Sequence, residues 1–278
     1  MIKDHSISRE TFGVTECLDC GFLFTNPRPH PSGFDHYYQS DEYVSHGIAR
    51  SSLQNRLYAA ARKWALGRKF ALIQRYQKNG KVLDIGCGTG EFLAHLMSRG
   101  YLAQGVEPSL RAREYAIAEH GLNVVPSVDL VAAQEQFQVL TMWHVLEHVH
   151  DPRTMFKRAF ALLAEHGLFV IAVPDRESWD AQYYGTYWAA WDVPRHLSHF
   201  RRADIHALTQ EHGFELVATR KMWLDAFYIA LLSEQYKGTP QWLSFIKAVI
   251  IGGWSNLVSL FSDRPTSSTL YIARKLAI

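Results

Sequence analysis

The chain has 278 residues, of which 47% are hydrophobic, so it is long enough to bury a full core in one large domain with appendages. Its 29 Lys and Arg against 27 Asp and Glu give a net charge of +2, which excludes the strongly basic balance typical of nucleic-acid-binding proteins. Three cysteines exclude a disulfide framework, and the first residues lack a signal-peptide pattern, so we expect a cytoplasmic protein.

Residues 1–50 predict a small N-terminal lobe that serves as a lid. Cys17 and Cys20 form half of a zinc knuckle, but the chain has no second Cys-x-x-Cys pair to complete four ligands. We therefore expect a reduced, metal-free lobe. The substitute zinc ligands that the lobe offers are histidines: His5, His30 and His36.

Residues 53–77 predict a helix with one polar side. Its basic residues are expected to lie on a solvated face. They are Arg56, Arg62, Lys63, Arg68 and Lys69.

The run KVLDIGCGTGE at residues 81–91 predicts a buried strand, a glycine turn and the start of a helix. Its three glycines allow a positive φ and leave room for a ligand against the main chain. A second strand at 102–107 ends in Glu107, 21 positions after Gly86, close to the offset at which an acid meets a ribose. These features predict one half of a nucleotide-type site.

The order of the glycines separates two cofactor classes. Dinucleotide sites use G-x-G-x-x-G to face a pyrophosphate, whereas this chain has G-x-G-x-G preceded by Asp84 and followed by no basic residue. An acidic loop repels phosphate and suits a ligand with an amino group and a sulfonium. DIGCGTG followed by GVEP resembles the first two motifs of class I S-adenosylmethionine-dependent methyltransferases. The resemblance implies cofactor contacts from Asp84, Gly86, Cys87, Gly88, Gly90, Glu107 and Pro108.

Two other functions stay open at this point. One is an NAD-dependent oxidoreductase, although the G-x-G-x-G order argues against it. The other is a non-catalytic module that binds S-adenosylmethionine without turnover.

The remaining elements predict a Rossmann-like, doubly wound α/β sheet with helices on both faces. Six parallel strands and one antiparallel strand are expected in a domain of residues 51–278, with insertions at 175–200 and 221–268. Ser109 caps a helix that Gly121 stops, and Asp151-Pro152 opens another that is expected to end at Gly167. The other expected strands are 123–125, 137–142, 168–173, 214–220 and 269–274.

The segment WHVLEHV at residues 143–149 follows the fourth strand, where ligands of open α/β sheets bind. It resembles methyltransferases related to the ubiquinone-biosynthetic enzymes. That resemblance implies that Trp143 and His144 lie beside the adenine and the methionine part of the cofactor, with Trp143 able to stack on the purine.

An H-x-x-E-H run within this segment could bind a metal ion. On one helical turn, His144, Glu147 and His148 share a face and could converge on a divalent ion. In the ubiquinone-type enzymes an acidic version of this segment is associated with a metal, but here His144 replaces the acid. We therefore expect no metal, with Glu147 and His148 satisfying local groups.

Residues 183–200 predict a loop with aromatic and ionisable side chains that carries acceptor contacts. YWAAWDVPRHLSHF resembles a segment over the methyl-transfer site in a bacterial subfamily with an N-terminal Cys-x-x-Cys lobe. The alternative is a structural plug in which Asp192 pairs with Arg195. The catalytic candidates are His144, His196, Asp192 and Arg195, with a histidine as general base.

The run from Trp242 to Phe261 is about as long as a membrane span. It contains Lys247 and a Gly252-Gly253 break, so we expect an amphipathic helical pair packed on the protein, without stable membrane anchoring.

The expected partner is a small or medium-sized acceptor, methylated on oxygen or carbon with S-adenosylhomocysteine as product. Nucleic acid is not expected, and the oligomeric state is open.

Overall fold

The computed structural model describes residues 1–30, 36–37, 53–132 and 134–277. Part of the expected lid therefore lies outside the described residues, as do the side chains of Arg56, Arg62 and Lys63. The helices are α2 (Leu53–Tyr76), α3 (Glu91–Met97), α4 (Leu110–His120), α5 (Pro152–Leu162), α6 (Trp179–Tyr184), α7 (Arg202–Glu211), α8 (Asp225–Tyr236) and α9 (Gln241–Leu260).

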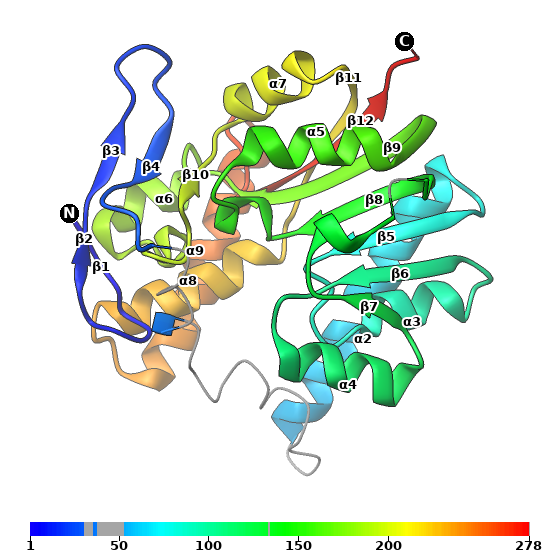
Figure 1. Ribbon diagram of the computed structural model, residues 1–278. Helices are drawn as coiled ribbons and strands as arrows, with labels where there is room; N and C mark the ends of the chain where they lie inside the picture. The colour runs from blue at the N-terminus through cyan, green and yellow to red at the C-terminus, as the bar shows by residue number, and fades with distance from the viewer. Residues whose placement is uncertain (31–35, 38–52, 133, 278) are drawn as a thin grey trace.

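A seven-stranded sheet forms the centre of the molecule (Figure 1). Its order is β11-β12-β9-β8-β5-β6-β7, and β12 runs antiparallel to both of its neighbours while the other pairs are parallel. The predicted fold class is confirmed. The strands are β5 (Lys81–Ile85), β6 (Leu102–Val106), β7 (Asn123–Val125), β8 (Phe137–Trp143), β9 (Leu163–Pro174), β11 (Phe214–Lys221) and β12 (Ser268–Lys275).

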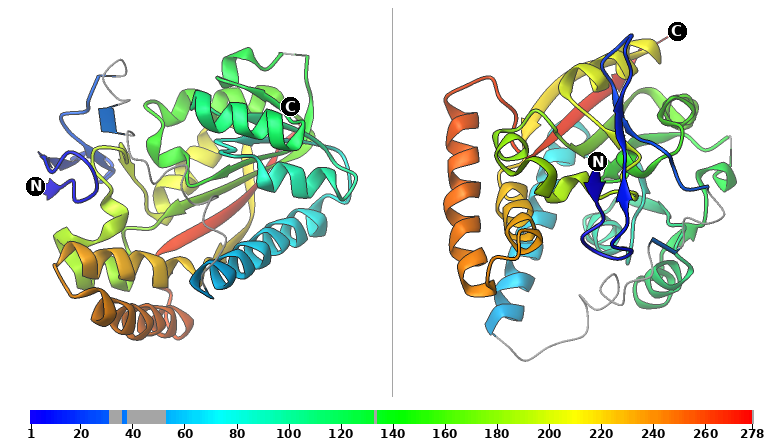
Figure 2. Two further views of the ribbon diagram at one scale, coloured as in Figure 1. Left: turned by 90° about the horizontal axis from the view of Figure 1, so that it is seen from below. Right: turned by 90° about the vertical axis from the view of Figure 1, so that its left-hand side faces the viewer.

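Both faces of the sheet are covered by helices, because alternate strand residues are apolar on each side (Figure 2). Leu83 and Ile85 of β5 belong to the cluster that includes Phe156 of α5, whereas Val82 joins the cluster that includes Phe92 of α3. Because β5, β6 and β8 run parallel, their carboxyl ends lie at the same edge of the sheet.

The helix that opens at Asp151-Pro152 is shorter than predicted. It ends at Leu162, and Leu163 already pairs with Phe137 of β8. The expected end at Gly167 is wrong because residues 163–167 belong to strand β9, whose pairing with β8 outweighs their helical sequence pattern. A Cβ at Gly167 would meet the Ala164 carbonyl oxygen at 2.9 Å, so glycine is needed inside β9.

The predicted helical pair at residues 242–261 is also wrong, since Gln241–Leu260 forms one continuous helix. Gly252 does not break it. A Cβ there would lie 2.9 Å from the Phe227 ring and 3.0 Å from the Ala226 carbonyl oxygen. Glycine in a helix costs about 1 kcal/mol relative to alanine, and the close packing of α9 on α8 offsets that cost.

The N-terminal residues pair with the insertion that follows β9. The strands β3 (Val14–Glu16), β4 (Leu23–Thr25) and β10 (Ser198–His199) form a small antiparallel sheet, beside a hairpin of β1 (Ile2–Lys3) and β2 (Thr11–Phe12). Thr25 Oγ1 donates to the His196 carbonyl oxygen at 2.6 Å. The N-terminal segment thus holds the loop of residues 175–200 in place.

Replacing Asp175 with asparagine is expected to stabilise the protein at pH 8. Burial raises the pKa of Asp175 from 3.8 to about 7. The folded state therefore holds more protons than the unfolded state between these values, and stability falls as pH rises through that window. Since one pKa unit corresponds to about 1.4 kcal/mol, a gain of a few kcal/mol is expected from denaturant unfolding at pH 8. The variant and wild type should differ less at pH 5, and an equal gain at both pH values would contradict this origin.

Candidate active site

The glycine loop forms an open cradle at the carboxyl end of β5. Gly86, Gly88 and Gly90 have φ values of 75°, 56° and 82°, and a Cβ on Gly88 would meet nothing within 4 Å. A Cβ on Gly86 would lie 2.4 Å from Val145 Cγ2, so the loop packs against the segment that follows β8. The two predicted cofactor motifs are therefore neighbours.

Glu107 supports this loop from the end of β6. Its carboxylate accepts from the Gly88 N–H at 2.8 Å and from the Ser109 N–H at 2.9 Å. Burial raises the pKa of Glu107, and these two backbone bonds oppose that rise. Pro108 is exposed beside it, whereas the Cys87 side chain points into the core against Gly105. Cys87 can thus meet a ligand only through its backbone.

Asp84 lies under the loop. Thr141 Oγ1 donates to Asp84 Oδ1 at 2.5 Å. Burial raises the pKa of Asp84 to about 6, while Thr141 and Lys69 oppose the rise. Asp84 thus supplies negative charge from beneath the glycine cradle.

Lys69 of α2 is a site residue that the sequence did not reveal. We expected it on a solvated face, but it is only half-exposed, and its Nζ lies 4.3 Å from the centroid of the Trp143 ring. The opposite charges of Asp84 and Asp225 face it. Trp143 packs edge-on against Phe92. Because Lys69 already lies over the Trp143 ring, a purine that stacks on this ring would contact Lys69 as well.

His144 lies between two carboxylates directly after β8. Its Nε2 is 3.0 Å from Asp225 Oδ2 and its Nδ1 is 3.4 Å from Glu147 Oε1. Burial lowers the pKa of His144, but the two carboxylates outweigh burial and raise it above its ordinary value. His144 also has a φ of 55°, a left-handed conformation that is rare for residues other than glycine and is concentrated at functional sites.

Glu147, His148 and His196 come together although His196 is on the distant loop. One ligand atom of each lies within 4.8 Å of the others, and the two imidazole rings have centroids 4.6 Å apart. Glu147 is 1% exposed, and neither carboxylate oxygen has a hydrogen bond within the part of the chain that the structure describes. Three nearby ligand atoms, one of them on a buried carboxylate, fit a divalent cation. This set contains His196, whereas the sequence suggested His144.

His196 is held in one tautomer. Its Nδ1 lies 2.8 Å from the Ala190 carbonyl oxygen, so this nitrogen carries the proton. Its Nε2 is 3.8 Å from Asp192 and 4.0 Å from Glu147. His148 differs, because burial and the neighbouring His196 lower its pKa to about 4 and leave it neutral at pH 7. His196 Nε2 can therefore accept a proton between two carboxylates.

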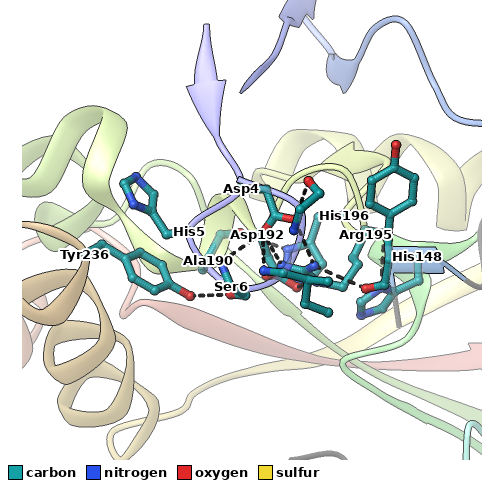
Figure 3. Close-up of polar contacts among 12 residues, drawn as sticks. Asp4, His5, Ser6, His148, Ala190, Asp192, Arg195, His196 and Tyr236 are labelled. Carbon is teal, nitrogen blue, oxygen red and sulfur yellow. Dashed lines mark hydrogen bonds and ion pairs between the residues drawn. The ribbon is translucent and has the colours of Figure 1, made fainter. Parts of the chain in front are cut away.

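Arg195 bridges two carboxylates (Figure 3). Its Nη2 lies 2.5 Å from Asp192 Oδ1 and 3.1 Å from Asp4 Oδ1. The pairing of Asp192 with Arg195, which the sequence offered as a structural alternative, is thus present and extends to the N-terminal segment. Figure 3 also shows Tyr236 reaching Ser6, so α8 contacts the same region.

The structure joins all four predicted catalytic residues in one polar chain. It runs from Asp225 through His144, Glu147 and His196 to Asp192, and then through Arg195 to Asp4. Asp4 and Asp225 were missed, and no local pattern marks them. Thr141 can be recognised from the sequence, because it is a polar residue inside the largely apolar strand FQVLTMW.

Cys17 and Cys20 lie away from this site. Cys17 is half-buried and Cys20 is exposed. Within the described ranges, no group of three potential ligand atoms includes either cysteine.

Comparisons with known proteins agree with this geometry. Residues 56–219 match the family model described as "Methyltransferase domain". A ubiquinone biosynthesis O-methyltransferase from Parvibaculum lavamentivorans is 34% identical over 103 residues, covering 34% of this chain and 41% of that protein. One from Rhodopseudomonas palustris is 24% identical over 173 residues, covering 55% and 68%. The chain spans about half the length of the first curated relatives it matches.

Solved structures share the fold. A cyclopropane synthase from Mycobacterium tuberculosis superposes with a TM-score of 0.56 at 14% identity, covering 90% of this chain and all of that one. Magnesium protoporphyrin IX methyltransferase from Synechocystis, solved with bound S-adenosylhomocysteine, gives 0.55 at 12% identity, covering 88% and 95%. With the family match and the glycine cradle, these findings show that the chain belongs to the class I S-adenosylmethionine-dependent methyltransferases, distantly related to the ubiquinone biosynthesis O-methyltransferases.

Proposed function

We propose that this protein transfers a methyl group from S-adenosylmethionine to a hydroxyl oxygen of a small or medium-sized acceptor. The observation that carries the proposal is the position of His196 Nε2, a proton acceptor flanked by Asp192 and Glu147. Glu147 is two residues from Val145, which packs on Gly86 of the glycine cradle. The name of the ubiquinone biosynthesis O-methyltransferases supports oxygen as the acceptor atom. Membership in the subfamily with an N-terminal Cys-x-x-Cys lobe stays a prediction.

Methyl transfer from a sulfonium is an in-line displacement that needs no covalent enzyme intermediate. The chain has to align donor and acceptor and to exclude water, and alignment alone is worth about 7–11 kcal/mol. Glu107, Asp84 and the loop glycines are proposed to orient S-adenosylmethionine. Lys69, whose Nζ lies 4.3 Å from the centroid of the Trp143 ring, is proposed to lie at the adenine end of the cofactor.

Proton removal is assigned to His196. Its Nδ1–H is held by Ala190, and the carboxylates of Asp192 and Glu147 stabilise the imidazolium that forms. His144 is already protonated between Asp225 and Glu147, so it is proposed to stabilise negative charge on the acceptor rather than to act as a base. A divalent cation held by Glu147, His148 and His196 is the alternative: it would occupy Nε2, so His196 would act as a ligand instead of a base, and the cation would lower the pKa of an acceptor hydroxyl.

Calorimetry with S-adenosylhomocysteine tests the cofactor assignment. Wild type is expected to bind it, and Glu107→Ala is expected to weaken binding about ten- to hundred-fold, because the Gly88 and Ser109 N–H groups lose a charged acceptor. Glu114→Ala on the exposed side of α4 is the matched control and should bind like wild type.

Two results would contradict the assignment. Binding of NAD without binding of S-adenosylhomocysteine would favour an oxidoreductase. Tight binding of S-adenosylhomocysteine with no methyl transfer to any hydroxyl, amine or carbon acceptor in a labelled-donor screen would favour a non-catalytic module.

A further inference from the structure

Helix α9 buries mostly small side chains and exposes large apolar ones. Its buried positions are Ser244, Ala248, Gly252, Ser255 and Ser259, together with one large apolar side chain, Ile251. This is the reverse of a surface helix in a globular protein, which turns its large apolar side chains inward. The exposed side chains are Trp242, Phe245, Ile246, Val249, Ile250, Trp254, Leu257 and Leu260, followed by Phe261.

The inner face of α9 is already satisfied by the protein. Ser255 Oγ donates to Asp180 Oδ1 at 2.7 Å, and Lys247 Nζ donates to Glu234 Oε2 at 3.0 Å. Figure 2 shows α9 as the outermost helix, with α8 between it and the sheet. A helix that crossed a bilayer would carry the Lys247–Glu234 pair into hydrocarbon at high cost. Although α9 is long and apolar enough to span a membrane, its contacts therefore favour a position along a surface.

The outer face is uninterrupted by charge. Lys247 is the one charged residue of α9, and it faces Glu234. Phe261 is 80% exposed, Trp242 69% and Ile250 64%. Twenty residues of helix extend about 30 Å, and an apolar surface of this kind on a soluble protein marks a binding site.

We propose that this outer face of α9 docks reversibly on the surface of an anionic phospholipid bilayer. A single convex helix suits a deformable lipid surface better than a protein partner, which would need a matching groove. Trp242 and Phe261 lie at its two ends, and aromatic rings favour the membrane interface. Exposed Lys237 and Arg264 flank the helix beside one exposed acid, Asp263, while the charge of Lys247 is met by Glu234, so the exposed charge around the helix is basic on balance and suits anionic headgroups.

The same face leads towards the active site. Trp223, Leu224 and Tyr228 extend the exposed apolar surface onto the start of α8. Asn256 of α9 donates to the Trp223 carbonyl oxygen at 2.8 Å, and Asp225, two residues further along the chain, pairs with His144. Docking would therefore bring the acceptor side of the site close to lipid.

Vesicle sedimentation with the 278-residue chain tests the proposal. Wild type is expected to bind vesicles of phosphatidylcholine and phosphatidylglycerol and to bind less as salt is raised. The triple variant Phe245→Ser, Ile250→Ser and Leu257→Ser should lose about ten-fold or more of this binding. The matched control carries three exposed apolar residues from the distant edge of the sheet: Leu102→Ser, Leu110→Ser and Leu130→Ser. It should bind like wild type.

The measurement is independent of methyl transfer, and all of the replaced side chains are exposed, so circular dichroism should show the same fold in both variants. Wild-type protein that stays unbound, or binding that the control loses equally, would overturn the proposal. Light scattering without lipid provides the second readout. A wild-type dimer that the triple variant converts to a monomer would assign the face to a second copy of the chain and would also overturn it.

Discussion

Replacing Arg195 with methionine is expected to lower the free energy of unfolding by about 3–5 kcal/mol. The Arg195 side chain is 8% exposed and bridges Asp4, which is fully buried, and Asp192. Burial raises the pKa of Asp4, but Arg195 and local backbone bonds outweigh burial and hold it at about 2. Methionine would fill similar space and leave two carboxylates without their cation. Denaturant unfolding at pH 7 measures the loss.

The matched control is Arg153→Met. Arg153 pairs with Glu211 at 3.1 Å, but both side chains are exposed, at 68% and 47%. Because water screens such a pair, the change should cost less than about 1 kcal/mol. Equal losses in the two variants would contradict a structural role for the buried bridge. The Arg195 loss should also shrink as the pH falls towards the pKa of Asp4, since a protonated carboxyl no longer needs a cation.

Replacing His196 with asparagine is expected to lower kcat about 10²- to 10⁴-fold with little change in the affinity for S-adenosylhomocysteine. The asparagine amide can still donate to the Ala190 carbonyl oxygen, so the loop should keep its shape. Steady-state kinetics on an acceptor found in the labelled-donor screen provide the measurement.

His212→Asn is the control for this variant, because His212 makes the same kind of bond, from Nδ1 to the Leu208 carbonyl oxygen, at the C-terminal end of the remote helix α7. Its kcat should stay near wild type. Chelator treatment separates base from metal ligand: if wild type loses activity with chelator and recovers with a divalent cation, His196 acts by holding the ion. Full activity of His196→Asn would falsify both roles.

The amino-acid pattern predicted the sheet and the cofactor loop closely. Strand β5, the glycines after it and the acid at the end of β6 were located because apolar alternation and a positive φ are local properties of a short segment. The errors arose where tertiary pairing outweighed local pattern. Residues 163–167 joined β9 instead of α5, and Gly252 stayed in one helix because it packs on Phe227.

By itself, the sequence determined the order of strands along the chain, the glycine cradle and the class of cofactor. Only the tertiary structure decided how the ionisable residues pair. Arg195 meets Asp4 across 191 positions and His144 meets Asp225 across 81. Such partners leave no periodic trace, because each is brought in by a separate element that packs for its own apolar contacts. The same holds for α9, since which of its faces stays exposed depends on the helix it packs against.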